Sequence, residues 1–193
     1  MMRRLGPADY RDMPWKNGGG VTRELLKLPQ SSDPARFLAR LSIATVGESG
    51  PFSLFHGIER TIMLLDGAGM ALAIGGAREV VLDRRYQPFV FPGEAETHCR
   101  LLGGPVRDFN LMVDRALAEG SLEVVHLAPG ETRTLASAAT VLLYVLEGRA
   151  SVAGTPLAVE EALWLEEPGA LAVRSDEGAF LAAIYLRPRS LTS

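Results

Sequence analysis

The chain has 193 residues, a formal net charge of -3, 47% hydrophobic residues and 22% charged residues. This is ordinary globular composition, and the lack of a Lys/Arg-rich run excludes the electrostatic footprint of a nucleic-acid or anionic-membrane binder. No apolar stretch approaches the ~20 residues of a membrane-spanning helix. Met1–Asp9 lacks the apolar run of a secretory signal and Cys99 is the only cysteine, so we expect a cytoplasmic protein without an internal disulfide.

Short β-favouring runs separated by glycine and proline dominate the chain, and this pattern is typical of sandwiches and barrels. In chain order the predicted strands are residues 37–46, 60–65, 70–74, 80–82, 88–91, 109–113, 122–127, 141–146, 150–152, 163–165, 170–174 and 180–186. One helical turn is expected at Arg115–Glu119, where Gly120 would end it and where it would link two lobes.

The glycine and proline turn signals of the first half of the chain recur in the same order in the second half. In both halves an apolar run ends in an acid and a glycine, the signal of a hairpin turn that needs positive φ. Three anchors recur in the same order, namely Gly50 and Gly130, Gly67 and Gly148, and the corners Pro92-Gly93 and Pro168-Gly169. A duplicated small barrel explains this repetition.

The order of strand, glycine turn, strand and Pro-Gly corner is that of cupin jelly rolls, which hide their sheet edges by folding two sheets face to face. We therefore predict an all-β bicupin fold with two jelly-roll barrels. Residues 1–115 should form an N-terminal lobe that carries the ligand pocket, and residues 116–193 a smaller C-terminal lobe.

The stretch Met13-Pro14-Trp15-Lys16-Asn17-Gly18-Gly19-Gly20-Val21-Thr22-Arg23-Glu24 strongly resembles the HutD/Ves family. Gly50-Pro51-Phe52-Ser53, Glu59-Arg60 and Asp108-Phe109-Asn110-Leu111-Met112 follow in that family's order, so the resemblance spans residues 10–115. It implies a bicupin fold, no established catalytic activity, and a link to histidine utilisation (HutD) or stress response (Ves). For the HutD branch it implies binding or sensing of a small pathway acid such as formylglutamate or urocanate.

Metal chemistry is not expected in either barrel. Metallo-cupins hold their ion with His-x-His, a Glu and a distant His, because imidazole and carboxylate suit iron, manganese, nickel and zinc. In such cupins the Glu lies seven residues before the turn glycine, a position that Arg60 occupies in the first half and Val141 in the second. The histidines of the chain are His56, His98 and His126, and they do not complete such a set. We predict no metal, no cofactor and no catalytic residue.

Candidate ligand-binding residues come from several segments of the first barrel. Arg60 should point inward and offer its planar guanidinium to a carboxylate, while Glu59 faces solvent. Asp108 and Asn110 share a strand face and should form a polar network with Arg60 and Glu24. The full candidate set is Trp15, Asn17, Thr22, Glu24, Arg40, Ser53, Phe55, Arg60, Asp108, Asn110 and Met112.

Structural explanations stay open for the same residues. The strand at 21–26 is equally explained by a solvated polar face with Trp15 against the core. The Arg60 network is also explained by a salt bridge that plugs the barrel without any ligand.

The favoured function is a non-catalytic binding or regulatory protein for a small carboxylate. The alternative is a metal-independent cupin isomerase or epimerase, for which His98 with Asp108 or Glu24 is the candidate acid–base pair. A third hypothesis is a protein–protein module that uses the apolar strands of the second half. We expect no nucleic-acid and no membrane partner, and a homodimer stays open.

Overall fold

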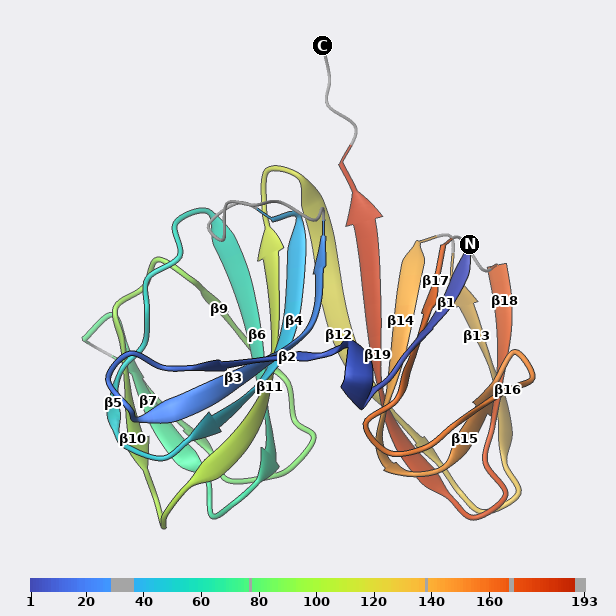
Figure 1. Cartoon of the computed structure of the whole chain (residues 1–193). Coiled ribbons are helices and arrows are strands. Elements are labelled where there is room, and N and C mark those ends of the chain that lie inside the picture. Colours follow the sequence, from blue (N-terminus) through green and yellow to red (C-terminus); the bar gives the residue numbers. More distant parts are fainter. Residues whose placement is uncertain (29–36, 77, 138, 167–168, 190–193) are drawn as a thin grey trace. The chain divides into compact units, whose positions relative to one another are not determined.

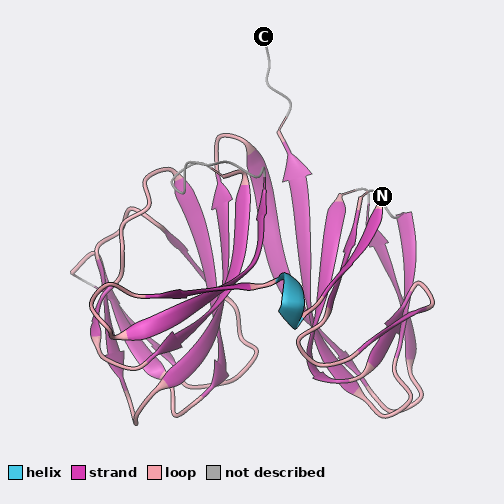
Figure 2. Cartoon of the chain, viewed as in Figure 1, coloured by secondary structure: helices cyan, strands magenta, loops and turns pink. Residues whose placement is uncertain are grey.

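The computed structural model describes residues 1–28, 37–76, 78–137, 139–166 and 169–189, and almost all regular structure in them is β-strand (Figures 1 and 2). The helical element in this part of the chain is the 3-10 turn η1 (Pro7–Asp9). None of the described helical structure is long and apolar enough to cross a membrane. The predicted all-β class is confirmed. Pro168, one of the repeat anchors, lies outside the described residues.

The chain forms two compact units, which we call the N-terminal lobe (Arg11–Glu119 with Arg189) and the C-terminal lobe (Met1–Tyr10 with Gly120–Pro188). In the N-terminal lobe the larger sheet has the order β2-β3-β4-β11-β6-β9 and the smaller sheet β5-β10-β7-β8. The larger sheet consists of β2 (Arg11–Pro14), β3 (Gly20–Leu28), β4 (Ala39–Val46), β11 (Val106–Asp114), β6 (Ile58–Asp66) and β9 (Phe89–Pro92). The smaller sheet consists of β5 (Gly50–Pro51), β10 (Thr97–Leu101), β7 (Met70–Ile74) and β8 (Arg78–Leu82).

The C-terminal lobe also has two antiparallel sheets, with the orders β1-β17-β14-β19-β12 and β13-β18-β15-β16. The larger sheet consists of β1 (Met2–Leu5), β17 (Ala162–Leu165), β14 (Thr140–Gly148), β19 (Ala179–Pro188) and β12 (Ala118–Leu127). The smaller sheet consists of β13 (Thr132–Ser137), β18 (Gly169–Arg174), β15 (Ala150–Val152) and β16 (Thr155–Leu157).

Four strands of each larger sheet and all four strands of each smaller sheet have the same order in the two lobes. The order β4-β11-β6-β9 in one lobe matches β12-β19-β14-β17 in the other, and β5-β10-β7-β8 matches β13-β18-β15-β16. The equivalent turn glycines have positive φ, 99° at Gly67 and 78° at Gly148, as their sequence context predicts. The shared topology supports the duplication inferred from the repeated anchors.

The division between the lobes differs from the predicted one at the start of the chain. Residues 1–10 were assigned to the N-terminal lobe, but β1 pairs with β17, with Met2 opposite Leu165 and Leu5 opposite Ala162. The Leu5 side chain is buried there. A four-residue strand gives a weak periodic signal, so the sequence pattern did not reveal this long-range pairing.

The predicted helical turn at Arg115–Glu119 is wrong. Asp114 caps a tight turn instead, since its Oδ1 accepts a hydrogen bond from the Ala116 amide at 2.9 Å and its carbonyl accepts one from the Leu117 amide at 3.1 Å. β12 begins directly afterwards, so Gly120 lies inside a strand rather than at a helix end.

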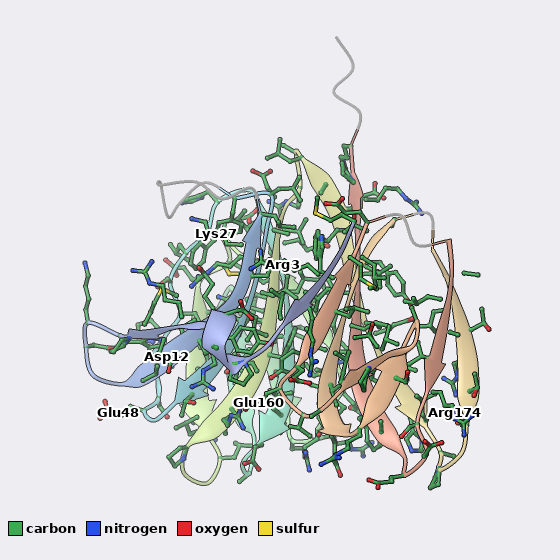
Figure 3. All side chains as sticks on the ribbon, turned by 45° about the vertical axis from the view of Figure 1, so that its right-hand side comes forward. Arg3, Asp12, Lys27, Glu48, Glu160 and Arg174 are labelled. Carbon is green, nitrogen blue, oxygen red and sulfur yellow. The ribbon has the colours of Figure 1, made fainter. Side chains whose placement is uncertain are left out.

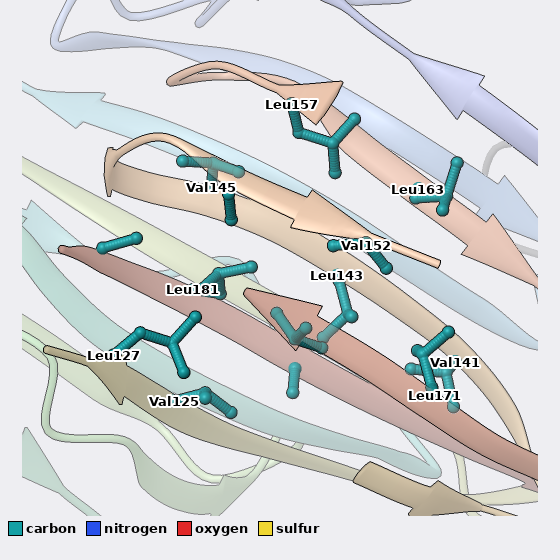
Figure 4. Close-up of a cluster of buried hydrophobic side chains, with 14 of the residues drawn as sticks. Val125, Leu127, Val141, Leu143, Val145, Val152, Leu157, Leu163, Leu171 and Leu181 are labelled. Atoms are coloured by element: carbon teal, nitrogen blue, oxygen red, sulfur yellow. The ribbon is translucent and has the colours of Figure 1, made fainter. Parts of the chain in front are cut away.

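The interiors of the two lobes differ. Aliphatic side chains from both sheets fill the C-terminal lobe, as Figure 4 shows for residues such as Leu127, Leu143 and Leu181. In the N-terminal lobe an apolar cluster that includes Ile62 and Met70 fills only part of the interior. Charged side chains such as Glu48 and Arg174 lie at the periphery (Figure 3). The remaining interior of the N-terminal lobe is the place where a site can form.

Replacing Gly67 by alanine should destabilise the fold by about 1–3 kcal/mol. A Cβ there would lie 2.6 Å from the Pro105 carbonyl oxygen, and the φ of 99° disfavours any L side chain. Gly50→Ala is the matched control, because a Cβ at Gly50 meets nothing within 4 Å. Urea unfolding of the two variants measures the difference, and equal losses would contradict this explanation.

Candidate functional site

A cavity of about 490 Å³ lies within the N-terminal lobe, a size in the usual range for small-molecule sites. Its walls combine strand residues of the larger sheet with the β2–β3 turn and the segment after β5. The lining residues are Met13, Pro14, Trp15, Lys16, Asn17, Thr22, Arg40, Ser42, Ala44, Val46, Pro51, Phe52, Ser53, Phe55, Arg60, Asp108, Asn110 and Met112.

Strand register explains why these side chains meet. β11 lies between β4 and β6, and Met112 stands opposite both Arg40 and Arg60. Alternate residues along a strand point to the same face, so the next two rows on this face contain Asn110 and Asp108. The predicted shared face of Asp108, Asn110 and Met112 is therefore present, and it faces the cavity.

Arg60 is the buried cation of the site, with 8% of its surface exposed. Its guanidinium carbon lies 5.0 Å from the ring centroids of Phe52 and Phe91, and 5.8 Å from that of Phe55. Nη2 donates a hydrogen bond to Asn110 Oδ1 at 2.9 Å, but the buried Nε has no acceptor among the described residues. Burial lowers the pKa of Arg60 to about 10, so the group is still a cation at neutral pH. The predicted inward orientation of Arg60 is confirmed.

Asp108 is the buried acid of the same wall, with 1% of its surface exposed. Its Oδ1 accepts a hydrogen bond from Asn110 Nδ2, so Asn110 connects the acid to Arg60. Burial raises the pKa of Asp108 from 3.8 to about 7, against the opposing effects of the Arg60 charge and the Asn110 hydrogen bond. Arg60 therefore has a compensating charge nearby but no carboxylate in direct contact.

Glu24 does not take its predicted place in this network. Its Oε2 accepts a hydrogen bond from Arg40 Nε at 2.7 Å, and Glu24 is absent from the cavity wall. The β3–β4 register shifts between Glu24 and Leu26, which interrupts the alternation assumed for residues 21–26. Glu24 thus neutralises Arg40 rather than completing the polar group around Arg60.

The β2–β3 turn closes one side of the cavity. Trp15 Nε1 donates to Thr22 Oγ1 at 2.8 Å, and the Trp15 amide donates to the Gly20 carbonyl at 2.9 Å. A Cβ on Gly20 would lie 2.4 Å from the Thr45 carbonyl oxygen, so this position of the triple glycine requires close backbone approach. Asn17 Oδ1 accepts from the Gly19 amide at 3.1 Å, which shapes the turn.

The cavity brings together the predicted candidates other than Glu24, which are Trp15, Asn17, Thr22, Arg40, Ser53, Phe55, Arg60, Asp108, Asn110 and Met112. Sequence reasoning missed Met13, Pro14, Lys16, Ser42, Ala44, Val46, Pro51 and Phe52. Extending the strand alternation from Arg40 would have found the three β4 residues in that set. The others lie next to predicted residues, in the short strands β2 and β5 or in the loops beside them, where the periodic signal is weak or absent.

The C-terminal lobe has apolar residues where the N-terminal lobe has its polar group. Val141 lies seven residues before Gly148, as Arg60 lies seven before Gly67. By the equivalent strand register, Ala183 and Leu181 take the places of Asn110 and Asp108. All three replacements belong to the core of the C-terminal lobe, so this interior is closed by packing at the equivalent place.

The candidate acid–base pair of His98 with Asp108 is not assembled in this cavity. His98 lies on β10, is exposed, and lines a separate hollow of about 470 Å³ with Leu54 and Glu96. Within the described residues no group of three or more His, Cys, Asp and Glu side chains is arranged to hold a metal ion.

Solved structures with this fold are all-β, cupin- and pirin-like jelly rolls. The Escherichia coli pirin YhhW, crystallised in complex with nickel(II), has a TM-score of 0.70 at 10% identity, over 98% of this chain and 100% of that one. At this identity the likeness defines the fold class alone. This chain is therefore a cupin-like jelly-roll protein with a polar cavity in one lobe.

The HutD family profile matches residues 7–183, so the chain belongs to the HutD family. An uncharacterized 21.2 kDa protein in the hutC 3′ region of Pseudomonas putida is 39% identical over 151 residues, 78% of this chain and 77% of that protein. Protein Ves of Cronobacter sakazakii is 35% identical over 82% of this chain and 86% of that protein. The structure of HutD from Pseudomonas fluorescens has a TM-score of 0.85 at 34% identity, over 98% of this chain and 100% of that one. The predicted family is confirmed.

Asp108→Asn should change how stability depends on pH. Because the folded chain raises the pKa of Asp108 from 3.8 to about 7, protonated Asp108 favours folding, and this contribution is complete below about pH 3.8 and is lost as the pH rises from there through about 7. The variant should therefore gain stability relative to the parent protein over this range, by up to about 4 kcal/mol. Urea unfolding across the range measures the gain.

Asp66→Asn is the matched control, because Asp66 is exposed on neighbouring β6. This variant should show no comparable gain. A difference between Asp108→Asn and the parent that is the same at every pH would contradict the assigned titration of Asp108.

Proposed function

We propose that this protein binds a small carboxylate in the N-terminal lobe without transforming it, and that Arg60 pairs with the ligand. The main support is the guanidinium itself, which is buried in the cavity wall with its Nε unpaired among the described residues. An unsatisfied buried donor costs about 1–3 kcal/mol. A planar carboxylate that enters the cavity would remove part of this penalty and neutralise the cation.

The charge of the cavity supports an anionic ligand. Lys16, Arg40 and Arg60 line it, whereas Asp108 is the acidic side chain in the wall. Phe52 and Phe55 provide an apolar surface beside the guanidinium, which suits a short carbon chain that carries a carboxylate. The chemistry that fits is therefore a small organic acid with apolar and polar parts.

Membership of the HutD family suggests which acids to examine first. The relative in the hutC 3′ region of Pseudomonas putida supports a link to histidine utilisation. We propose a histidine-pathway acid such as formylglutamate or urocanate, bound in a regulatory role. Thermal-shift measurements with N-formyl-L-glutamate and urocanate test this: a rise in melting temperature without consumption of the acid supports binding, and no rise with either acid argues against the proposal.

A metal-independent isomerase or epimerase is the second candidate, and one observation favours it. The pKa of Asp108, raised to about 7, is suited to proton transfer at neutral pH. The same thermal-shift samples distinguish the two functions when the acid is examined by NMR after incubation in deuterated water. Exchange of a carbon-bound proton that is lost in Asp108→Asn would support the enzyme.

Arg60→Ala should weaken the binding of N-formyl-L-glutamate by ~1.5–3 kcal/mol, because a charge-assisted hydrogen bond in a buried site is lost. Isothermal titration calorimetry measures the affinity, and near-ultraviolet circular dichroism checks that the variant is folded. Arg100→Ala is the control, since Arg100 is exposed and pairs with Glu79 in the same lobe. Unchanged affinity in a folded Arg60→Ala protein would refute the role of Arg60.

A further inference from the structure

A buried acid and a buried cation share one cavity wall without touching each other. Asn110 lies between them, accepting a hydrogen bond from Arg60 at 2.9 Å and donating one to Asp108. In the described part of the chain the structure records no ion pair between Arg60 and any carboxylate. The two charges therefore interact across an amide, and each is free to respond to a third charge in the cavity.

We propose that the cavity takes up one proton together with its anion, and that the Asp108 carboxyl holds this proton. The inference rests on the proposed function, because it assigns a proton to the same binding event. Its physical basis is the charge balance of the cavity wall before and after an anion is bound.

Without ligand, Arg60 and ionised Asp108 carry one positive and one negative charge. An anion at Arg60 adds a second negative charge beside Asp108, which is 1% exposed and has little water to screen it. The bound anion also neutralises the positive charge of Arg60, which had favoured ionisation of Asp108. Protonation of Asp108 by solvent restores the original charge of the wall, and no covalent bond to the ligand forms or breaks.

Among the titratable groups near the cavity, Asp108 is the one suited to bind this proton. Arg60 on β6 has a pKa of about 10 and Cys99 on β10 a pKa of about 11, so both keep their protonation state near neutral pH. On β4, Arg40 is paired with Glu24 of β3, and Lys16 lies exposed at the β2–β3 turn. The histidines of this lobe do not line the cavity.

Because of Asn110, Asp108 can take up a proton without any rearrangement of the cavity wall. Its Nδ2 donates to an Asp108 oxygen, which accepts whether the carboxyl is ionised or protonated on its other oxygen. Protonation therefore leaves the hydrogen bond from Arg60 to Asn110 in place. The cavity keeps its shape while its charge changes, so pH acts on affinity through the charge of the cavity wall rather than through a rearrangement of it.

Affinity for N-formyl-L-glutamate should then fall about tenfold for each pH unit above neutral, as expected when one proton is bound with the ligand. The carboxyl groups of this probe are fully ionised above about pH 6, so the ligand does not contribute to the pH dependence. Calorimetric titrations at about pH 8, in Tris and in triethanolamine, give the number of protons from the difference in observed enthalpy. These buffers are cationic and do not compete for the cavity.

The parent protein and Asp66→Asn should each take up about one proton per bound anion, whereas Asp108→Asn should take up none and bind with an affinity that does not depend on pH. Binding without proton uptake in the parent, or uptake that persists in Asp108→Asn, would overturn this inference and leave the proposed function intact. No binding at any pH would overturn both.

Discussion

A guanidinium held between two β-sheets requires compensation, and the N-terminal lobe is organised around that requirement. Three aromatic rings surround Arg60, the Asn110 amide accepts a hydrogen bond from it, and the Asp108 carboxyl lies on the other side of that amide. Even with these partners, the buried Nε of Arg60 has no hydrogen-bond acceptor among the described residues. Close packing of apolar side chains around such a group would bury it without hydrogen bonds, which is energetically costly, so the lobe keeps an accessible cavity beside it.

The duplicated topology shows how few positions separate a cavity from a closed core. The lobes share the order of eight strands, but Val141, Leu181 and Ala183 replace the cation, the acid and the amide in the C-terminal lobe. Aliphatic side chains need no partners, so the two sheets of that lobe close on each other through a continuous apolar cluster. One scaffold thus gives a site in one copy and a packed core in the other.

The strands that carry Arg60 and Asp108, and the inward-facing residues on them, were predictable from the sequence because they depend on local alternation, whereas strands such as β10 and β13 were not predicted. The inward orientation of Arg60 and the shared face of Asp108 and Asn110 follow from the period of two along a strand. Glu24 could not be placed this way, since a register shift in β3 interrupts the period. The pairing of Asn110 with both charged groups depends on neighbours from different strands, and single-strand periodicity contains no information about it.

The pairing of strand β1 affects the order in which the two lobes can fold during translation. The ribosome makes Met2–Leu5 before any other strand of the larger C-terminal sheet, yet their partner β17 spans Ala162–Leu165. Until β17 emerges from the ribosome, β1 has no native partner strand, and Leu5 cannot be buried as it is in the folded protein. The N-terminal lobe contains its own strands from Arg11 onward, so the lobe that contains the cavity is able to fold cotranslationally, whereas the C-terminal lobe needs strands from near both ends of the sequence.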